Sequence, residues 1–361
     1  MSAQHERGVY FALYLAISLI LAFHCYLHPS LSVDLLAYAG NVALSDTNDV
    51  VKVHELVYRE SLPPHLRGAD SDDLRRRATD AYYSAAYLPY FSVKPLYVLS
   101  MIAVHRAGAN LVDSSRIVSV ASFLAVAVVL WLYTGSILSL LILLLPEVLP
   151  LGQLNDPDGM SAFLVLLALW AIVRQKRFGV LPLLLSVWVR PETAILCVLL
   201  AGVLVFLQQM DFRTGLVTVF AAVLSFVLIS HFGYGWKSLY FHTFLGGEAT
   251  AVPHFDVRDY VRAVGAGARE VIHSSVPIFV VLWLASFRNS AYEMRLLLAV
   301  SALYSLVRFA IFPSFEYRYY ALFFLVTGIA AVCLISRPSA RAMNISVDDS
   351  KQTLTLRSAG Q

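Results

Sequence analysis

The chain has 361 residues, of which 58% are hydrophobic and 14% are charged, and its mean hydropathy is +0.68. These values exclude an ordinary soluble globular domain. Apolar stretches run from end to end, and they must form helices because an unpaired backbone group in hydrocarbon is costly. The net charge of +3 is too small to indicate a nucleic-acid partner. Cys25, Cys197 and Cys333 have neither disulfide nor metal spacing, so we expect them to be ordinary buried residues.

The first apolar stretch, Val9–Leu27, lacks a small-residue cleavage site before His28 and is predicted to be an uncleaved membrane span. Nine further apolar segments follow: Pro95–Val104, Ile117–Tyr133, Ile137–Leu151, Met160–Val173, Phe178–Leu207, Leu216–Ile229, Val276–Phe287, Leu296–Phe312 and Ala321–Ile335. Phe178–Leu207 is too long for one span and is interrupted by Arg190-Pro191-Glu192, which predicts two short helices. The chain is therefore predicted to be an all-α membrane protein, a bundle of about ten transmembrane helices.

The polar segments between these stretches predict the domain organisation. Residues 1–336 are expected to form one polytopic membrane domain, with a first outer loop at 28–92 and a second at 231–275. In the first loop, Val50, Val53 and Val57 recur at helical spacing, and a second amphipathic helix is predicted at about 71–87. Both helices are expected to lie in the membrane interface. Residues 337–361 are polar and without periodicity, which predicts a disordered cytoplasmic tail.

The basic loops predict the orientation, because loops rich in lysine and arginine remain in the cytoplasm. Such residues flank the first span, the Met160–Val173 segment and the last span: Arg7, Arg174, Lys176, Arg177, Arg337 and Arg341. An even number of crossings must then separate Arg7 from Arg174. One of the segments 95–104, 117–133 and 137–151 therefore fails to span, and Pro95–Val104 is the first candidate because it is the shortest. This parity puts both termini in the cytoplasm, and Asp34, residues 153–159, the Arg190 break and residues 313–319 on the outer face.

Three carboxylates are candidates for chemistry on that outer face. Asp34 lies in the apolar stretch VDLLAY just beyond the first span, where partial desolvation makes a carboxylate a better general base. The alternative is an acid that merely starts a helix or marks the topology. Asp156 and Asp158 flank Pro157 before a predicted helix, whose N-terminal dipole favours one of them. The other is then available to bind a substrate hydroxyl or a cation.

Several charged residues lie inside or beside the later apolar segments. Arg190 and Glu192 interrupt a span, where charge is costly and normally faces a cavity or the protein interior. They are expected to line a cavity or, alternatively, to pair with other helices. Lys94, Arg308 and Arg318 are candidates to bind a phosphate, although each of them is equally able to snorkel to ordinary headgroups.

The remaining polar residues indicate what the site lacks. His242, His254, Asp256 and Glu248 share the second outer loop at irregular spacing, so no metal site is predicted. No glycine-rich nucleotide loop and no activated serine or cysteine nucleophile is recognisable in the sequence. An activated substrate is therefore expected to arrive through the membrane.

Five short motifs, in order, resemble the GT-C superfamily of membrane glycosyltransferases, which use polyprenyl-phosphate-linked sugars. They are Ser32-Val33-Asp34, Lys94-Pro95-Leu96, Asn155-Asp156-Pro157-Asp158, Val189-Arg190-Pro191-Glu192 and Glu316-Tyr317-Arg318-Tyr319. The resemblance covers about residues 9–335. It departs from the family in having no sizeable soluble domain after the last span and no acceptor-peptide motif of the oligosaccharyltransferase type, which leaves the acceptor open.

The resemblance implies an inverting hexosyl- or pentosyltransferase of a bacterial plasma membrane, with no cofactor or metal. Asp34 would be the catalytic base and Asp156 or Asp158 would position the acceptor or the sugar. The expected substrate-binding residues are Lys94, Arg190, Glu192, Glu316, Arg318, His242 and His254. The expected partners are the lipid-linked donor, a glycan, lipid or protein acceptor, and membrane lipids. A transporter or flippase of an anionic or lipid-linked substrate and a non-catalytic assembly subunit remain as alternatives.

Overall fold

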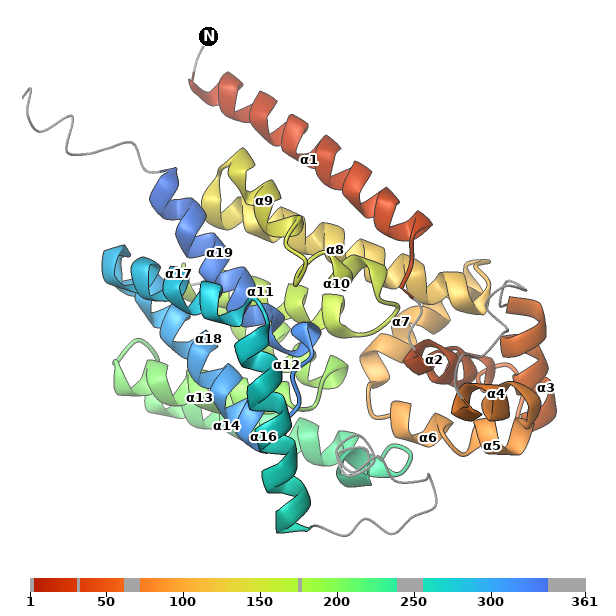
Figure 1. Cartoon of the computed structure of the whole chain (residues 1–361). Coiled ribbons are helices and arrows are strands. Elements are labelled where there is room, and N and C mark those ends of the chain that lie inside the picture. The colour runs from red at the N-terminus through yellow and green to blue at the C-terminus, as the bar shows by residue number, and fades with distance from the viewer. Residues whose placement is uncertain (1–2, 31–32, 62–71, 175–176, 239–255, 337–361) are drawn as a thin grey trace, which may run out of the picture.

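The computed structural model describes residues 3–30, 33–61, 72–174, 177–238 and 256–336 (Figure 1). Within these ranges the chain is helical, and its only β pairing is one isolated parallel bridge between Ser30 and Leu154. The longer helices are α1 (Ala3–Leu27), α2 (Val33–Ala43), α7 (Pro95–Arg106), α8 (Leu111–Thr134), α11 (Asp158–Val173), α12 (Val180–Val189), α13 (Thr193–Phe206), α14 (Phe212–Ile229), α16 (Val257–His273), α17 (Val276–Asn289), α18 (Tyr292–Ile311) and α19 (Ala321–Ile335). The shorter elements are α3 (Val50–Glu55), η1 (Leu56–Ser61), α4 (Asp72–Thr79), α5 (Ala81–Ala85), α6 (Leu88–Phe91), η3 (Ile137–Ser139), α9 (Leu140–Leu143), α10 (Pro150–Gln153), η4 (Arg177–Gly179) and η5 (Tyr317–Tyr320).

Five helical stretches among the described residues are long and apolar enough to cross a membrane: His5–Leu27, Leu111–Thr134, Phe212–Ile229, Tyr292–Ile311 and Tyr317–Ile335. Two bent pairs, α5–α6 with α7 and α16 with α17, raise the number to seven if each is one span. α11, α12 and α13 are apolar but shorter. The part of the chain that the structure describes is therefore all-helical, with five to seven candidate membrane spans, and the expected number of about ten stays a prediction.

Ile137–Leu151 is one of the three segments of which one is expected not to span, and it does not form one continuous helix. The segment forms η3, α9 and the start of α10, and neither of these α-helices exceeds four residues. Pro146 and Pro150 explain the break, since proline removes a helical hydrogen bond and clashes with the preceding turn. Pro95–Val104, the first candidate for a segment that does not span, lies in α7, which is bent by 118° from the α5–α6 pair.

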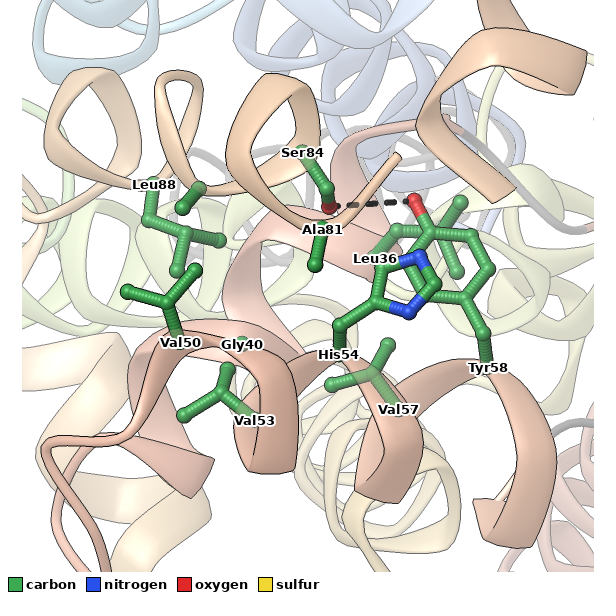
Figure 2. A pocket seen from close by; sticks show the side chains of 11 residues that line it. Leu36, Gly40, Val50, Val53, His54, Val57, Tyr58, Ala81, Ser84 and Leu88 are labelled. Carbon is green, nitrogen blue, oxygen red and sulfur yellow. Dashed lines mark hydrogen bonds between the residues drawn. The ribbon is translucent and has the colours of Figure 1, made fainter. Parts of the chain in front are cut away.

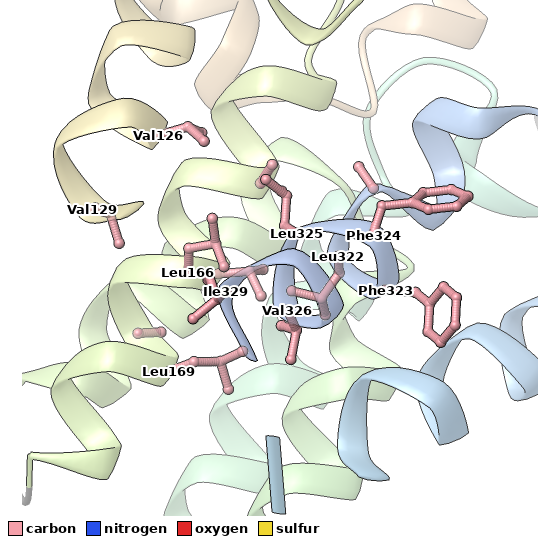
Figure 3. Packing of buried hydrophobic residues seen from close by; sticks show 14 of the residues in the cluster. Val126, Val129, Leu166, Leu169, Leu322, Phe323, Phe324, Leu325, Val326 and Ile329 are labelled. Carbon is pink, nitrogen blue, oxygen red and sulfur yellow. The ribbon is translucent and has the colours of Figure 1, made fainter. Parts of the chain in front are cut away.

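α19 lies at the centre of the main hydrophobic core, where it packs against α8, α11, α17 and α18 (Figure 3). Phe324, Leu325 and Ile329 are almost completely buried, because apolar residues occur on all sides of this helix. α19 also passes close to α9, since a Cβ added at Gly328 would lie 3.1 Å from Ile142 Cγ1. The residues that begin this helix are therefore fixed by a rigid surrounding bundle.

The short helices α2 to α7 gather around a second apolar core, which we call the N-terminal cluster. Val53 and Val57 are 4% and 1% exposed there, so the apolar face of the predicted first amphipathic helix is covered by protein and not by lipid headgroups. The predicted helix at about 71–87 is divided in two. Asp80 accepts hydrogen bonds from the Tyr82 and Tyr83 amides and thereby starts α5, while Tyr82 is 73% exposed.

A small cavity of about 10 Å³ lies inside the N-terminal cluster (Figure 2). Figure 2 shows the rings of His54 and Tyr58 side by side, and their centroids are 4.5 Å apart. Ser84 donates a hydrogen bond to the Tyr58 hydroxyl, while Val50, Val53, Leu88 and their neighbours line the rest of the cavity with apolar groups. No carboxylate lines this cavity, and it has no part in the site described below.

Candidate functional site

Arg318, on η5 just before α19, is the centre of the site. Its Nη1 atom lies 3.0 Å from Asp156 Oδ2 and 3.4 Å from Asp34 Oδ2, and its Nε atom lies 3.8 Å from Asp158 Oδ2 and 2.5 Å from Glu316 Oε2. One guanidinium, with its rigid fork of donors, thus joins carboxylates from three distant parts of the chain. All three carboxylates predicted as catalytic are brought together.

The bridge between Ser30 and Leu154 explains why Asp34 lies near the 153–159 loop. The Ser30 amide donates to the Gln153 carbonyl at 3.0 Å, which fixes the chain after α1 against the chain after α10. Asp34 follows in the first turn of α2. On the other side of the bridge, Asp156 Oδ1 accepts the Asp158 amide at 3.0 Å and so stabilises the turn that begins α11.

Arg190 and Glu192 lie in the break between α12 and α13 and join the same site. Arg190 Nη1 is 2.7 Å from Asp158 Oδ1 and 3.4 Å from Glu192 Oε1, and Arg308 Nη2 is 4.0 Å from that Glu192 oxygen. Pro191 ends the α12 helix so that both side chains turn inward. Burial raises the pKa of Glu192, but the charges of Arg190 and Arg308 outweigh burial and hold this pKa below its usual value.

Lys94 lies near the same cluster, in the loop between α6 and α7. Its Nζ atom donates to the Tyr38 hydroxyl at 2.5 Å, and Tyr38 follows Asp34 by one turn of α2. Burial and the charge of Arg190 lower the pKa of Lys94, although Asp34 acts in the opposite sense. The predicted residue Lys94 is therefore buried and lies within electrostatic range of Asp34.

Tyr319 is a site residue that the sequence reasoning missed. Its ring centroid is 3.9, 4.7 and 4.9 Å from the Cζ atoms of Arg308, Arg190 and Arg318, respectively. An aromatic face attracts cations, so one ring helps three like charges to lie close together. In the sequence, tyrosines at the ends of membrane segments are expected as interfacial anchors, and only the position of Tyr319 next to Arg318 could have indicated a role in the site.

The exposed fractions separate the three carboxylates. The Asp34 side chain is 28% exposed, whereas those of Asp156 and Asp158 are 0% and 2% exposed. Asp34 is therefore the one of the three that a solute can reach without rearrangement. Asp156 and Asp158, which are buried, hold Arg318 and Arg190.

A cavity of about 40 Å³ adjoins the two arginines. Its polar wall contains Asp158, Arg190, Arg318 and Tyr319. Its other walls come from α11, α13, α18 and α19, and are formed by Ser161, Ala162, Val165, Thr193, Leu196, Tyr304, Ala321 and Leu322. The cavity thus combines cationic groups with an apolar surface, which suits an amphiphile that has an anionic head.

Of the predicted second outer loop, 231–275, the structure describes residues 231–238 and 256–275. His242, His254 and Glu248 lie outside the described residues, and so does the tail 337–361. Asp256 caps α16 by accepting the Arg258 amide at 2.7 Å. Within the described ranges, no group of three or more His, Cys, Asp or Glu side chains has an arrangement that could hold a metal ion.

The fold defines the class of this protein as an all-helical integral membrane protein with a buried cluster of acids and arginines. No protein-family model, curated protein or solved structure matches the chain. The function must therefore be argued from the chemistry of the site and from the motifs in the sequence.

Proposed function

We propose that the protein is an inverting glycosyltransferase that moves a sugar from a polyprenyl-phosphate-linked donor to an acceptor hydroxyl at the outer face of the membrane. The observation that carries this proposal is the meeting of Asp34, Asp156 and Asp158 around Arg318, with Asp34 alone among the three open to solutes. A reachable carboxylate beside buried cations is the arrangement that general-base attack on a phosphate-linked carbon requires.

In this proposal Asp34 takes the proton of the acceptor hydroxyl as its oxygen attacks the anomeric carbon of the donor. The bond between that carbon and the phosphate oxygen breaks, its electron pair leaves with the polyprenyl phosphate, and the configuration at the carbon inverts. Negative charge develops on the departing phosphate. Arg190 and Arg318, which line the adjoining cavity, are suited to stabilise this charge in a site of low dielectric constant.

Asp156 and Asp158 act as positioning residues in this scheme. Asp156 holds Arg318 and the turn before α11, and Asp158 holds Arg190 at 2.7 Å. Each of these acids offsets the charge of an arginine, so the cations remain ordered before the substrate arrives. Lys94 adds a further positive charge near Asp34.

The chemistry of the cavity beside Arg190 and Arg318 supports a lipid-linked substrate. Its arginines suit a phosphate, and Leu196, Tyr304 and Leu322 provide an apolar wall for the first part of a lipid chain. The proposed setting is a bacterial plasma membrane, with the site on its outer face and both termini in the cytoplasm. A hexosyl and a pentosyl donor fit this chemistry equally well.

The test is sugar transfer from a polyprenyl-phosphate donor in proteoliposomes. Asp34→Asn should remain folded and lose at least about 100-fold of the transfer rate, because a general base typically contributes about 10²- to 10⁴-fold. Glu55→Gln is the matched control. Glu55 is a half-exposed acid of α3, away from the site, and its carboxylate pairs with Arg59 at 3.1 Å. Full transfer by Asp34→Asn would remove Asp34 from the mechanism.

Transport of an anionic or lipid-linked substrate is the second candidate function. The break between α12 and α13, with Arg190 and Glu192 between two apolar half-helices, favours it, because discontinuous helices carry the binding sites of many transporters. Counterflow of the donor across proteoliposomes without any covalent product would select transport. Transfer of the sugar without counterflow would select the enzyme. If the protein showed neither transfer nor counterflow, a non-catalytic subunit would be selected.

A further inference from the structure

α16 carries features that the proposed reaction does not use. This helix begins at Val257 after its cap Asp256, ends at His273, and is inclined by 70° to α17 (Figure 1). α17 is an apolar helix that continues into the bundle. α16 therefore does not continue the axis of α17.

One face of α16 packs on the protein. The Tyr260 hydroxyl donates a hydrogen bond to the Ala310 carbonyl, and a Cβ added at Gly267 would lie 2.7 Å from the Pro313 carbonyl oxygen. Residues 310–313 connect α18 to the Glu316–Arg318 segment. α16 therefore lies directly on the chain that carries the central arginine of the site.

A second face of α16 exposes large apolar side chains. Val257, Val261 and Ile272 are 63%, 61% and 68% exposed. At about 100° per residue, these positions fall within one narrow arc of the helix. The arc lies beside the packing face, so it can enter lipid while α16 stays attached to the protein.

A basic stripe borders that apolar arc on its other side. Arg258, Arg262 and Arg269 are spaced by four and seven residues, which aligns them along the helix, and His273 continues the line. Arg262 pairs with Asp259 at 3.0 Å, but both side chains are exposed, at 79% and 44%, so the pair is weak. Asp259 and Glu270 lie beyond the basic stripe, on the side away from the apolar arc.

We infer that α16 lies in the membrane interface, with its apolar arc at the boundary between headgroups and acyl chains and its arginine stripe on the phosphates of anionic phospholipids. Apolar residues on one face with arginines beside them are typical of helices that lie in this interface. The positive charge of the arginine stripe favours anionic phospholipids over neutral ones, since anionic headgroups attract basic residues near the surface. This inference does not rest on sugar transfer.

The experiment uses the full chain in nanodiscs, with a fluorescent probe attached to Val261→Cys. Cys333, which is partly exposed, is replaced by Ser so that it is not labelled, whereas Cys25 and Cys197 are buried and are kept. Lipids with a quencher on the acyl chain, either phosphatidylglycerol or phosphatidylcholine, report which lipid contacts the probe. Iodide reports exposure to water. A probe on Glu270→Cys serves as the water-exposed reference, and one on Phe220→Cys of α14, 66% exposed, serves as a lipid-facing reference away from the stripe.

We expect the Val261 probe to be protected from iodide and to prefer phosphatidylglycerol by about fivefold or more, because one basic residue near the surface contributes roughly that factor at low salt. The Phe220 probe should respond equally to both lipids. Replacing Arg258, Arg262 and Arg269 by Gln should abolish the preference at Val261 while the size-exclusion profile of the nanodiscs stays unchanged. Iodide quenching equal to that at Glu270, or a preference that survives the replacement, would overturn the inference.

Discussion

Arg318 Nη1 lies 3.4 Å from Asp34 Oδ2, although 284 residues separate the two in sequence. The same nitrogen lies 3.0 Å from Asp156 Oδ2. The Nη1 group of Arg318 therefore contacts both the partly exposed Asp34 and the fully buried Asp156. Arg318 directly precedes α19, which lies buried in the centre of the bundle. The packing of α19 therefore fixes the position of Arg318, and Arg318 in turn orients Asp34.

Arg318→Gln is the first prediction. Asp156 is fully buried, so removal of its cation leaves an uncompensated charge and should lower the free energy of unfolding by about 3–5 kcal/mol. Thermal unfolding in detergent measures the change. The double variant Arg318→Gln, Asp156→Asn should regain part of the loss, because the buried charge is gone. Arg262→Gln, on the exposed face of α16, should have little effect; equal losses for Arg262→Gln and Arg318→Gln would contradict the assigned role.

Tyr319 supplies the second prediction. Tyr319→Leu removes the ring that three guanidinium groups approach, and it should destabilise the protein by about 1–2 kcal/mol and reduce sugar transfer. Tyr319→Phe keeps the ring and loses only the hydrogen bond from Arg318 Nη2 at 3.3 Å, so it should remain close to the wild type. Thermal unfolding and initial transfer rates would be compared for both. Equal effects of the two variants would show that the ring is not what matters.

The charged residues of the site could be found from the sequence because charge is conspicuous in an apolar chain. Asp34, Arg190 and Arg318 interrupt or border apolar stretches, where each charge needs a partner. The contacts that join them could not be found, since the Ser30–Leu154 bridge has no local signature. Tyr38 and Tyr319 were missed because tyrosines at the ends of membrane segments are common for reasons of anchoring alone.

The differences in secondary structure have equally local causes. Ile137–Leu151 is one of three segments of which one was expected not to span; Pro95–Val104 was the first candidate because it is the shortest, but two prolines divide Ile137–Leu151. The predicted helix at about 71–87 ends at Thr79 because Asp80 caps a new one. In both cases the apolar pattern was given more weight than the residues that stop helices. The burial of Val53 and Val57 depends on α2 and α6, which no pattern within that segment reveals.

Glu192 gives a prediction about pH. Its pKa is lowered from the usual 4.5, so its contribution to stability is fully present above that value and is lost as the pH falls through the folded-state pKa. The melting temperature of the wild type should therefore fall more steeply between about pH 5 and pH 3 than that of Glu192→Gln. Thermal melts across this range measure the difference. Parallel pH profiles for the two proteins would contradict a lowered pKa at Glu192.

The last prediction compares the same substitution at two glycines of α16, Gly265 and Gly267. A Cβ at Gly267 would lie 2.7 Å from the Pro313 carbonyl oxygen and 3.0 Å from Phe309 Cε2, whereas a Cβ at Gly265 meets nothing within 4 Å. Gly265→Ala should stabilise the protein by about 0.5–1 kcal/mol, because alanine favours the helix. Gly267→Ala should lower the melting temperature and also the transfer rate, because α16 is pushed away from the chain that leads to Arg318. If Gly267→Ala gained stability as Gly265→Ala does, α16 would not be packed against that chain.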